Sequence, residues 1–218
     1  VNLLDAAVAA GVRRVLAVTS ADIYGPVEED DLPLTEDQPV RPVSPYGASK
    51  AAADIMCVTA GLAHGIEVVR ARSFNHLGPG QNDKFVASAI ASRIVQNERS
   101  GDHVVRVGNL EARRDFLHVD DALSAYRLLM REGNPGEAYN LGSGDARSIR
   151  EMLDLLLEVS GVDARTEMDP ERFRPVDVPM TCADIGKIGA LGWSPTRSVA
   201  QALDDLWRSL APADATVE

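Results

Sequence analysis

Tyr46 and Lys50 stand four positions apart in the segment SPYGASKAAAD, residues 44–54. On a helix, residues with this spacing share one face and can touch each other. A lysine ammonium beside a phenol favours the phenolate, so the pair could move a proton to or from a carbonyl or hydroxyl oxygen. Many tyrosine–lysine pairs with this spacing simply lie on a solvated helix face. Taken alone, the pair therefore indicates proton-transfer chemistry only weakly.

A serine hydroxyl that could hold the reacting oxygen occurs earlier in the chain. Ser20 lies in VTSADIYG, at the end of an apolar segment that predicts a buried strand over residues 13–20. A long loop rich in proline and acidic residues, 21–45, separates this serine from Tyr46. The order of strand, serine, long loop and Tyr-x-x-x-Lys is far more specific than the pair. It predicts catalytic roles for Ser20, Tyr46 and Lys50.

Alternating helices and strands are predicted to position these side chains. The predicted helices cover residues 1–10 and 45–64, and each precedes a predicted strand, at 13–20 and 66–72 respectively. Such alternation is typical of an α/β fold with a parallel sheet. Ligands of these sheets bind at the carboxyl ends of the strands, which is where Ser20 is expected.

The second half of the chain contains a less regular mixture of elements, which we expect to form a smaller α/β lobe over the edge of the sheet. In order, the prediction is a polar loop at 73–82, a helix at 84–98, a short strand from 104, a charged turn, a helix from 119, a strand at 137–141, a helix at 148–161, an extended piece at 164–168 and a helix at 198–210. Ser148 and Glu151 have the spacing of a capping box, which predicts where one of these helices begins.

The overall composition argues against several classes of partner. The 218 residues carry a formal net charge of −11, which disfavours binding to nucleic acid. No apolar run is long enough to predict a membrane span. The only cysteines, Cys57 and Cys182, are far apart, so we expect no metal site and a reducing, cytoplasmic location. A phosphate-containing ligand would need a local cluster of arginines to oppose the negative charge of the whole chain.

Several motifs together resemble those of the extended short-chain dehydrogenase/reductase family, which contains nucleotide-sugar epimerases, dehydratases and reductases. VTSADIYG and SPYGASK are followed, in the family's order, by RARSFNHLGPGQ, EARRDFLHVDD, EAYNLGSG and LGWSP. The resemblance extends over nearly the whole chain. Within the family, RSFNHLGPGQNDKFV, VGNLEARRDF and FRPVDVP most resemble the GDP-mannose branch of dehydratases and reductases. The resemblance implies a Rossmann-like parallel sheet, of which this chain would hold the C-terminal part.

The resemblance also implies roles for the residues at the strand ends. Tyr46 matches the catalytic acid/base, Lys50 its partner, and Ser20 the residue that binds the reacting oxygen. Tyr46, Lys50, Ser73 and Phe74 match positions that contact the cofactor, which would be NAD or NADP. In the family, the lysine hydrogen-bonds the nicotinamide ribose, and the positions of Ser73 and Phe74 lie beside the carboxamide.

Three further residues match positions that bind the nucleotide-sugar substrate in the family. Asn75 matches a contact near the diphosphate, and Arg114 and Arg174 match two arginines that clamp it. Arginine suits this task because its planar fork can donate two hydrogen bonds to phosphate oxygens at once. Arg114 could instead be a structural ion-pair partner of Asp115 or Asp120.

The triplet Ser20-Ala21-Asp22 bears on which reaction this family member would catalyse. The family's dehydratases have an acid and a base directly after the catalytic hydroxyl residue. Ala21 stands at the position of the acid and cannot transfer a proton. The GDP-mannose dehydratases, however, also lack an acid at that position. Asp22 could replace the usual glutamate as a catalytic acid/base, but it is one methylene shorter, and a misplacement of about 1 Å can cost on the order of a hundredfold in rate.

We therefore expect reduction of the C4 ketone of GDP-4-keto-6-deoxymannose by hydride transfer, with tyrosine as the acid. The alternatives are GDP-mannose 4,6-dehydration and 4-epimerisation of another nucleotide sugar. A non-catalytic NAD-binding relative of the same fold is an alternative of a different class, which the complete set of Ser20, Tyr46 and Lys50 disfavours.

In the family, the glycine-rich turn GxxGxxG after the first strand cradles the cofactor's pyrophosphate, and no early strand of this sequence is followed by such a turn and a helix. We expect that turn and the first strands to lie upstream of Val1, and the fragment alone to be inactive. Residues 1–82 would be the remainder of the NAD(P)-binding domain. Residues 83–218 would form mainly the nucleotide-sugar-binding lobe, with segments near 104–133 returning to the sheet.

Two predicted helices, 1–10 and 46–62, carry small apolar residues such as Ala6, Ala10 and Ala53. Small side chains let helices approach each other closely. In the resembled family these two helices pair across a dimer as a four-helix bundle, which implies a homodimer here. Packing of the two helices within one subunit would use the same residues.

Overall fold

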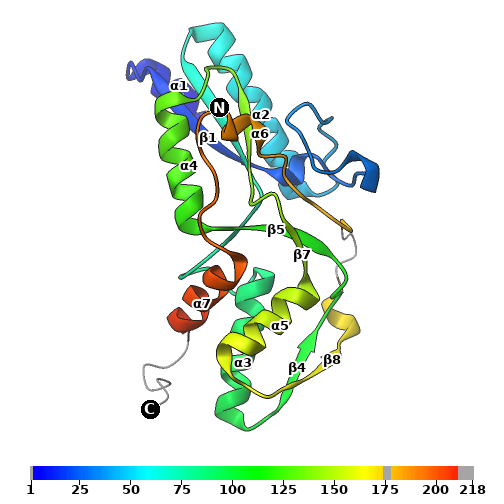
Figure 1. Cartoon of the computed structure of the whole chain (residues 1–218). Helices are drawn as coiled ribbons and strands as arrows, with labels where there is room; N and C mark the ends of the chain where they lie inside the picture. The colour runs from blue at the N-terminus through cyan, green and yellow to red at the C-terminus, as the bar shows by residue number, and fades with distance from the viewer. Residues whose placement is uncertain (1, 174–177, 211–218) are drawn as a thin grey trace.

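The computed structural model describes residues 2–173 and 178–210. The upper part of the molecule in Figure 1 is built on a parallel sheet with the strand order β1–β2–β6, formed by β1 (Arg14–Ser20), β2 (Glu67–Ser73) and β6 (Ala138–Leu141). Ser20 lies beside Ser73 in the register of the sheet, and Ser73 lies beside Leu141. The last residues of all three strands therefore meet at one edge of the sheet.

Helices cover both faces of this sheet, as the alternation in the sequence predicts. α1 (Asn2–Ala9) and α2 (Pro45–His64) lie on one face, and α4 (Val119–Glu132) lies on the other. Val68 belongs to the apolar cluster beneath α2, whereas Val69 belongs to the cluster beneath α4. Successive side chains of a strand point to opposite faces. A strand whose two faces are both covered by helices therefore needs apolar residues at most of its positions.

The lower part of the molecule in Figure 1 forms the smaller lobe. α3 (Val86–Ser100), α5 (Ile149–Ser160) and α7 (Val199–Leu210) pack around a shared apolar core, with the two-stranded parallel sheet of β4 (Val104–Val107) and β8 (Arg165–Met168) beside them. Fully buried side chains from all three helices form the centre of this core: Ile94, Met152, Leu156, Leu203 and Leu206.

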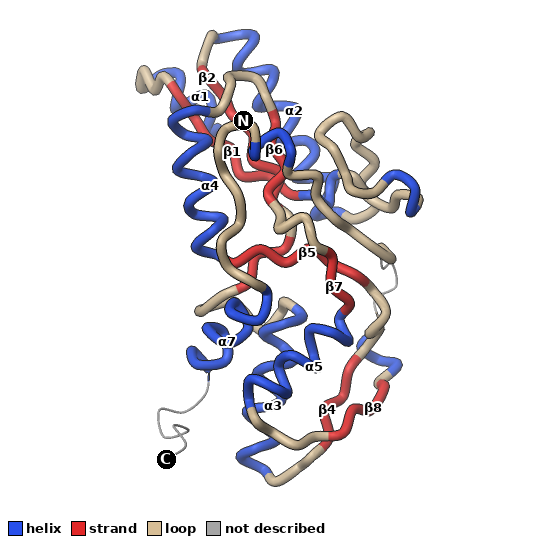
Figure 2. The backbone as a smooth tube through the Cα atoms, in the orientation of Figure 1, coloured by secondary structure: helices blue, strands red, loops and turns tan. Residues whose placement is uncertain are grey.

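A third set of strands lies between these two parts, as the tube in Figure 2 shows. β5 (Arg113–His118) pairs in parallel with β3 (Asn75–Leu77) and antiparallel with β7 (Ala146–Ser148). The sequence-based prediction was wrong here, since it placed a charged turn before residue 119 and a loop at 73–82. β5 is buried on both sides, because Phe116 lies in the core of the lower lobe and Leu117 in the apolar cluster beneath α4. Its two arginines occupy the register positions opposite β7.

The segment 104–133 contributes to both parts of the molecule. β4 pairs with β8 in the lower lobe, whereas α4 packs on the β1–β2–β6 sheet of the upper part. The remaining elements are short: η1 (Ala21–Ile23), η2 (Glu29–Asp31), η3 (Pro170–Arg172) and α6 (Gly186–Gly189). The protein thus has an α/β fold with parallel sheets. Among the described residues, no helix is both long and apolar enough to cross a membrane.

Candidate active site

Ser20 is the last residue of β1 and is buried at the carboxyl edge of the sheet. Its hydroxyl oxygen accepts a hydrogen bond from the Asp22 backbone N–H at 3.2 Å and so caps the short helix η1. The cap turns the chain sharply away from the strand and fixes the orientation of the serine side chain. Asp22 itself has an exposed side chain one residue into this turn.

The helix α2 brings Tyr46 and Lys50 to the same edge. Its N-cap is Ser44, whose hydroxyl accepts from the Gly47 N–H at 3.0 Å, and Pro45 occupies the first turn. Lys50 Nζ lies 5.8 Å from the centroid of the Tyr46 ring and donates a hydrogen bond to the Val18 carbonyl at 3.3 Å. The Tyr46 side chain is 53% exposed, so its hydroxyl can be reached from solvent.

Gly47 lets the start of α2 approach the turn after Ser20. A Cβ atom on Gly47 would lie 2.7 Å from the Asp22 carbonyl oxygen, which is closer than real Cβ contacts allow. Contacts on both sides of Ser20, at Val18 and at Asp22, therefore tie α2 to the serine. Through the contacts of Lys50 with Val18 and of Gly47 with Asp22, the three predicted catalytic residues lie at one edge of the sheet.

Ser73 and Phe74 follow at the end of the neighbouring strand β2. The Ser73 hydroxyl lies 2.8 Å from the Tyr126 hydroxyl of α4, which in turn lies 3.3 Å from His76 Nε2. Burial lowers the pKa of His76, so its imidazole is neutral near pH 7, and burial raises the pKa of Tyr126, although its hydrogen bond with Ser73 opposes that shift. Phe74 is buried in an apolar cluster with residues of η1 and α2.

The predicted substrate-binding residues lie where the sheet meets the lower lobe. Asn75 on β3 has an exposed side chain, and its amide donates to the Asp115 carbonyl at 3.3 Å. Arg114 on β5 donates from Nη1 to the carbonyls of Arg113, at 2.8 Å, and Pro179, at 3.4 Å. Asn75 and Arg114 are thus neighbours on paired strands. Arg174 lies outside the described residues.

The acidic neighbours of Arg114 make other contacts. Asp120 pairs with Arg197 at 3.1 Å. The carboxylate of Asp115, which has no exposed surface, accepts hydrogen bonds from the Ser143 N–H and hydroxyl and from the N–H groups of Gly144 and Ala183. Burial raises the pKa of Asp115, and these donors oppose the shift.

Two residues of this site were missed by reasoning from sequence. Asp115 holds the loop after β6 against β5, and Asp54 of α2 is buried against two arginines of β2. The sequence does carry a signal for Asp54. It follows Tyr46 and Lys50 at helical spacing, and two charged residues, Arg70 and Arg72, alternate with apolar residues in the strand that follows. That signal becomes meaningful only once the partners are known.

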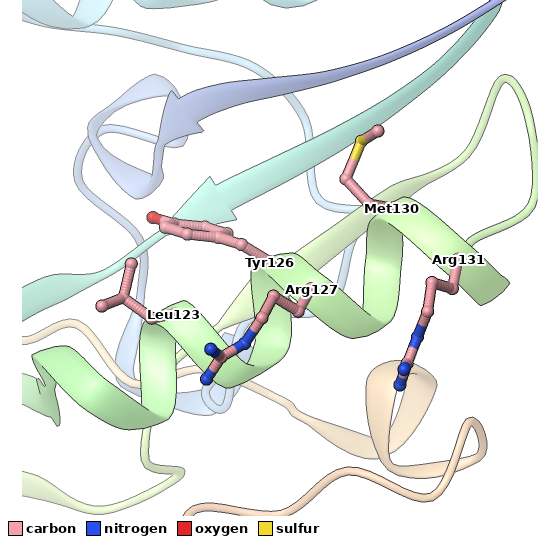
Figure 3. A pocket seen from close by; sticks show the side chains of 5 residues that line it. All are labelled: Leu123, Tyr126, Arg127, Met130 and Arg131. Atoms are coloured by element: carbon pink, nitrogen blue, oxygen red, sulfur yellow. The ribbon is translucent and has the colours of Figure 1, made fainter.

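An open surface hollow of about 490 Å³ lies along α4, the helix that covers the face of the sheet opposite α2. Figure 3 shows that its lining side chains all come from this helix: Leu123, Tyr126, Arg127, Met130 and Arg131. Of these, Tyr126 contacts the candidate site, through Ser73. Over residues 2–173 and 178–210, no group of three or more histidine, cysteine or acidic side chains could hold a metal ion.

This fold, with a serine, a tyrosine and a lysine at the carboxyl edge of its parallel sheet, is the arrangement that the resemblance to the extended short-chain dehydrogenases/reductases implies. The sequence profile of the family described as GDP-mannose 4,6 dehydratase matches residues 1–206. The chain therefore belongs to this family, within the NAD-dependent epimerases/dehydratases of the extended short-chain dehydrogenase/reductase type. The family resemblance predicted from the sequence motifs is confirmed.

Individual relatives within this class have different activities. The chain is 37% identical to the GDP-6-deoxy-D-mannose reductase of Pseudomonas aeruginosa, in a match that covers 93% of this chain and 67% of the reductase. It is 32% identical to the UDP-glucose 4-epimerase of Streptomyces lividans, over 94% of this chain and 65% of the epimerase. A match of 35% identity to the dTDP-glucose 4,6-dehydratase of Streptomyces griseus covers 74% of this chain and 48% of that protein.

Solved structures show the same architecture. The RMD protein of Pseudomonas aeruginosa in complex with NADPH superposes with a TM-score of 0.89 at 35% identity, over 96% of this chain and 70% of that one. The UDP-glucose 4-epimerase of Thermus thermophilus in complex with NAD gives a TM-score of 0.86 at 26% identity, over 99% of this chain and 68% of that one. The matches thus span about half to two thirds of the length of these three curated relatives and somewhat over two thirds of these two structures.

Proposed function

We propose that this protein reduces the C4 ketone of GDP-4-keto-6-deoxymannose with a reduced nicotinamide cofactor, NADH or NADPH. The observation that carries the proposal is the placement of Ser20, Tyr46 and Lys50 at one sheet edge in a chain 37% identical to a GDP-6-deoxy-D-mannose reductase. Asn75 and Arg114, on the neighbouring strands β3 and β5, would bind the diphosphate side of the substrate, together with Arg174.

The donors at the sheet edge fit the nicotinamide end of such a cofactor. An ammonium has three protons, and the bond from Lys50 to Val18 uses one of them, so Lys50 can also donate to a ribose hydroxyl. Ser73 would lie beside the carboxamide, and Tyr46 beside the ring. No early strand of these 218 residues is followed by a GxxGxxG turn for the pyrophosphate, because the pattern occurs only at 186–192, in and after the short helix α6. The proposal therefore concerns the whole protein to which these residues belong.

A reduced nicotinamide held by Lys50 and Ser73 would supply the hydride for the C4 carbon of the sugar. Tyr46 donates its phenolic proton to the C4 oxygen as negative charge develops there, which yields the alcohol. The Ser20 hydroxyl donates a hydrogen bond to the same oxygen and holds it in place. Lys50, 5.8 Å from the tyrosine ring, stabilises the phenolate that remains until water returns a proton.

Dehydration of GDP-mannose is the second candidate, and the exposed side chain of Asp22 beside Ser20 is the observation that favours it. In that reaction Asp22 would take part in removing water from C5 and C6 after oxidation at C4. The cofactor would be reduced and reoxidised within one cycle, so that none is consumed.

The deciding experiment uses the protein expressed from its complete reading frame. It is mixed with GDP-mannose, and separately with GDP-4-keto-6-deoxymannose plus NADH or NADPH, while the absorbance of the reduced cofactor is followed. Consumption of cofactor only with the keto sugar supports reduction. Conversion of GDP-mannose to a keto sugar without net consumption supports dehydration, and Asp22→Asn should then abolish it. If neither substrate reacts, the GDP-sugar assignment is wrong.

Replacement of the proposed acid gives a second check. We expect Tyr46→Phe to lower kcat by about 10²–10⁴-fold, because general acid catalysis contributes a factor of this size. Tyr139→Phe is the matched control, since Tyr139 is buried beneath α4 on the far face of the sheet. Equal losses in the two variants, or full activity in Tyr46→Phe, would remove Tyr46 from the mechanism.

We also propose that the protein is a homodimer, with α1 and α2 of one subunit packed against the same helices of its partner. Large apolar side chains on these helices are exposed in the single chain, namely Leu3 at 79%, Ile55 at 58% and Leu62 at 85%. Exposed apolar residues that gather on neighbouring helices are typical of protein–protein interfaces.

A further inference from the structure

A buried carboxylate fixes α2 to the sheet below the proposed acid. Asp54 follows Lys50 by four residues and Tyr46 by eight, so it continues the same helix face toward the sheet. Its side chain is buried, with the residue only 2% exposed. Acidic residues are rarely buried so completely unless they are paired.

Both carboxylate oxygens of Asp54 accept hydrogen bonds from side chains of the strands β1 and β2. One carboxylate oxygen accepts from Arg72 Nε at 3.1 Å and from the Thr19 hydroxyl at 3.2 Å, and the other accepts from Arg72 Nη2 at 3.0 Å and from Arg70 Nη1 at 2.5 Å. The pairing with Arg72 is bidentate, which fixes direction as well as distance. Thr19 is the residue before Ser20, so the same carboxylate ties α2 to the end of β1.

Arg72 has a second set of partners on the other side of the site. Its Nη1 donates to the Tyr24 hydroxyl at 3.1 Å and to the Glu36 carbonyl at 2.8 Å. The Tyr24 hydroxyl donates in turn to Asn140 Oδ1 at 2.7 Å. Tyr24 is fully buried and directly follows η1, the turn that Ser20 caps. One guanidinium therefore holds both the helix of Tyr46 and the turn of Ser20.

We propose that Arg72 is a positioning residue that sets the relative placement of Tyr46 and Ser20, with Asp54 and Tyr24 as its two arms. The inference rests on the proposed catalytic roles of Tyr46 and Ser20. Those two side chains must hold one oxygen between them, and errors of about 1 Å can cost on the order of a hundredfold in rate. The partly exposed bond from Lys50 to Val18 cannot supply that rigidity alone, whereas a buried, bidentate ion pair can.

Stability alone does not account for such a cluster. Removing two charges from water is expensive, and well-packed apolar residues of similar volume often stabilise a protein as much or more. A buried ion pair with fixed geometry is better suited to specifying one arrangement of neighbouring elements. Here the elements specified are those that carry the proposed acid and the proposed oxygen-binding serine.

The test uses Tyr24→Phe, which removes one hydroxyl from one arm, and Asp54→Asn, which removes the charge from the other. Asp121→Asn is the matched control, because Asp121 is also 2% exposed and also holds a remote segment, through bonds from Thr196 and Arg197. Each variant of the full-length protein is examined by amide hydrogen exchange without ligand and by steady-state kinetics with the keto sugar and the reduced cofactor.

If Arg72 couples the two arms, Tyr24→Phe should raise exchange at least tenfold both in residues 20–24 and, across the arginine, in residues 45–54. In Tyr24→Phe and Asp54→Asn, kcat should fall about tenfold or more while KM for the sugar stays within about twofold. Asp121→Asn should raise exchange near residues 196–198 and leave kcat unchanged.

The proposal is overturned if Tyr24→Phe leaves exchange in residues 45–54 unchanged, since the two arms would then be independent. It is also overturned if both arm variants keep the kcat of the unmodified protein. If the protein reduces no keto sugar, the proposed function fails, but the exchange measurement still decides whether Arg72 couples α2 to the turn.

Discussion

Single side chains at the sheet edge carry the proposed chemistry, and a buried charged residue holds the helix that presents them. Burial alone would raise the pKa of Asp54, but the hydrogen bonds and charges of Arg72 and Arg70 outweigh burial and hold this pKa below its ordinary value of 3.8. The carboxylate consequently stays ionised into the acidic range. Because the pKa is lower in the folded than in the unfolded state, the ionised group contributes stability to the fold.

The pH dependence of folding should reveal this contribution. The stability from Asp54 is fully present above a pH of about 4 and is lost as the pH falls through the lowered pKa of the folded state. We expect Asp54→Asn to lower the free energy of unfolding by about 3–5 kcal/mol near neutral pH, because it leaves the buried Arg72 and the partly buried Arg70 without their anion. That difference should shrink as the pH falls below about 4.

Urea unfolding of both proteins from neutral pH to about pH 2 measures the difference directly. The pKa values of Glu137 and Glu151 are also lowered, by Lys187 and by hydrogen bonds from Ser148 respectively, but both residues are present in both proteins and cancel in the comparison. A difference that stays constant across the acidic range would mean that Asp54 is not held ionised by its arginines.

At the scale of elements, the close approach of α2 to η1 decides whether the catalytic groups meet. The helix begins at Pro45, behind a serine cap, and its third residue is a glycine packed against the Asp22 carbonyl. Any side chain there would push the helix start, with Tyr46, away from the turn that carries Ser20. A glycine near a helix start thus has a packing reason here, rather than a conformational one.

Two glycines of α2 allow a matched comparison. Gly47→Ala would place Cβ 2.7 Å from a backbone oxygen, so we expect a loss of stability of about 1–3 kcal/mol and a fall in kcat. Gly61→Ala in the same helix meets only the Ile66 carbonyl, at 3.3 Å, and replaces a poor helix former by a good one, so stability should change little or rise. Thermal unfolding and kinetics of both variants check this, and equal activity in the two would mean that the start of α2 tolerates displacement.

At the scale of the whole molecule, α1 and α2 cover one face of the sheet, and their exposed apolar residues lie on the side of these helices that faces away from it. Their side chains face away from the apolar cluster formed by Cys57, Ala60, Ile66 and Val68. Burying such residues against a second subunit would contribute roughly 25 cal/mol for each Å² of apolar surface removed from water. The proposed dimer therefore predicts a strong effect of a charge placed on this surface.

We expect Leu62→Glu to convert the dimer into a monomer at micromolar concentration, because the charge would have to be buried in the interface. Sedimentation velocity of the full-length protein measures the change. Met168→Glu on β8 of the lower lobe is the control, since Met168 is similarly apolar and 54% exposed but lies far from α2. A monomeric unmodified protein, or a dimer that survives Leu62→Glu, would exclude this interface.

The sequence alone determined those features that depend on neighbours along the chain. Periodicity predicted α2 and the strands β1 and β2, and the spacing of Ser148 and Glu151 predicted a capping box that the structure confirms. The order of Ser20, Tyr46 and Lys50 predicted the family because these residues lie in short motifs whose spacing is local. Such patterns can be recognised in the sequence because helix and strand geometry determine which nearby side chains share a face.

Only the tertiary structure decided the features that join distant parts of the chain. β3 and β5 are strands because they pair with each other, and β5 also pairs with β7, although their polar sequences predict a loop and a turn. The partners of Arg72 and Tyr24 are also distant along the chain. Asp54 lies 18 positions from Arg72, and Asn140 lies 116 positions from Tyr24. A buried charge or hydroxyl must find a partner wherever the fold brings one, and no local pattern specifies which residue that will be.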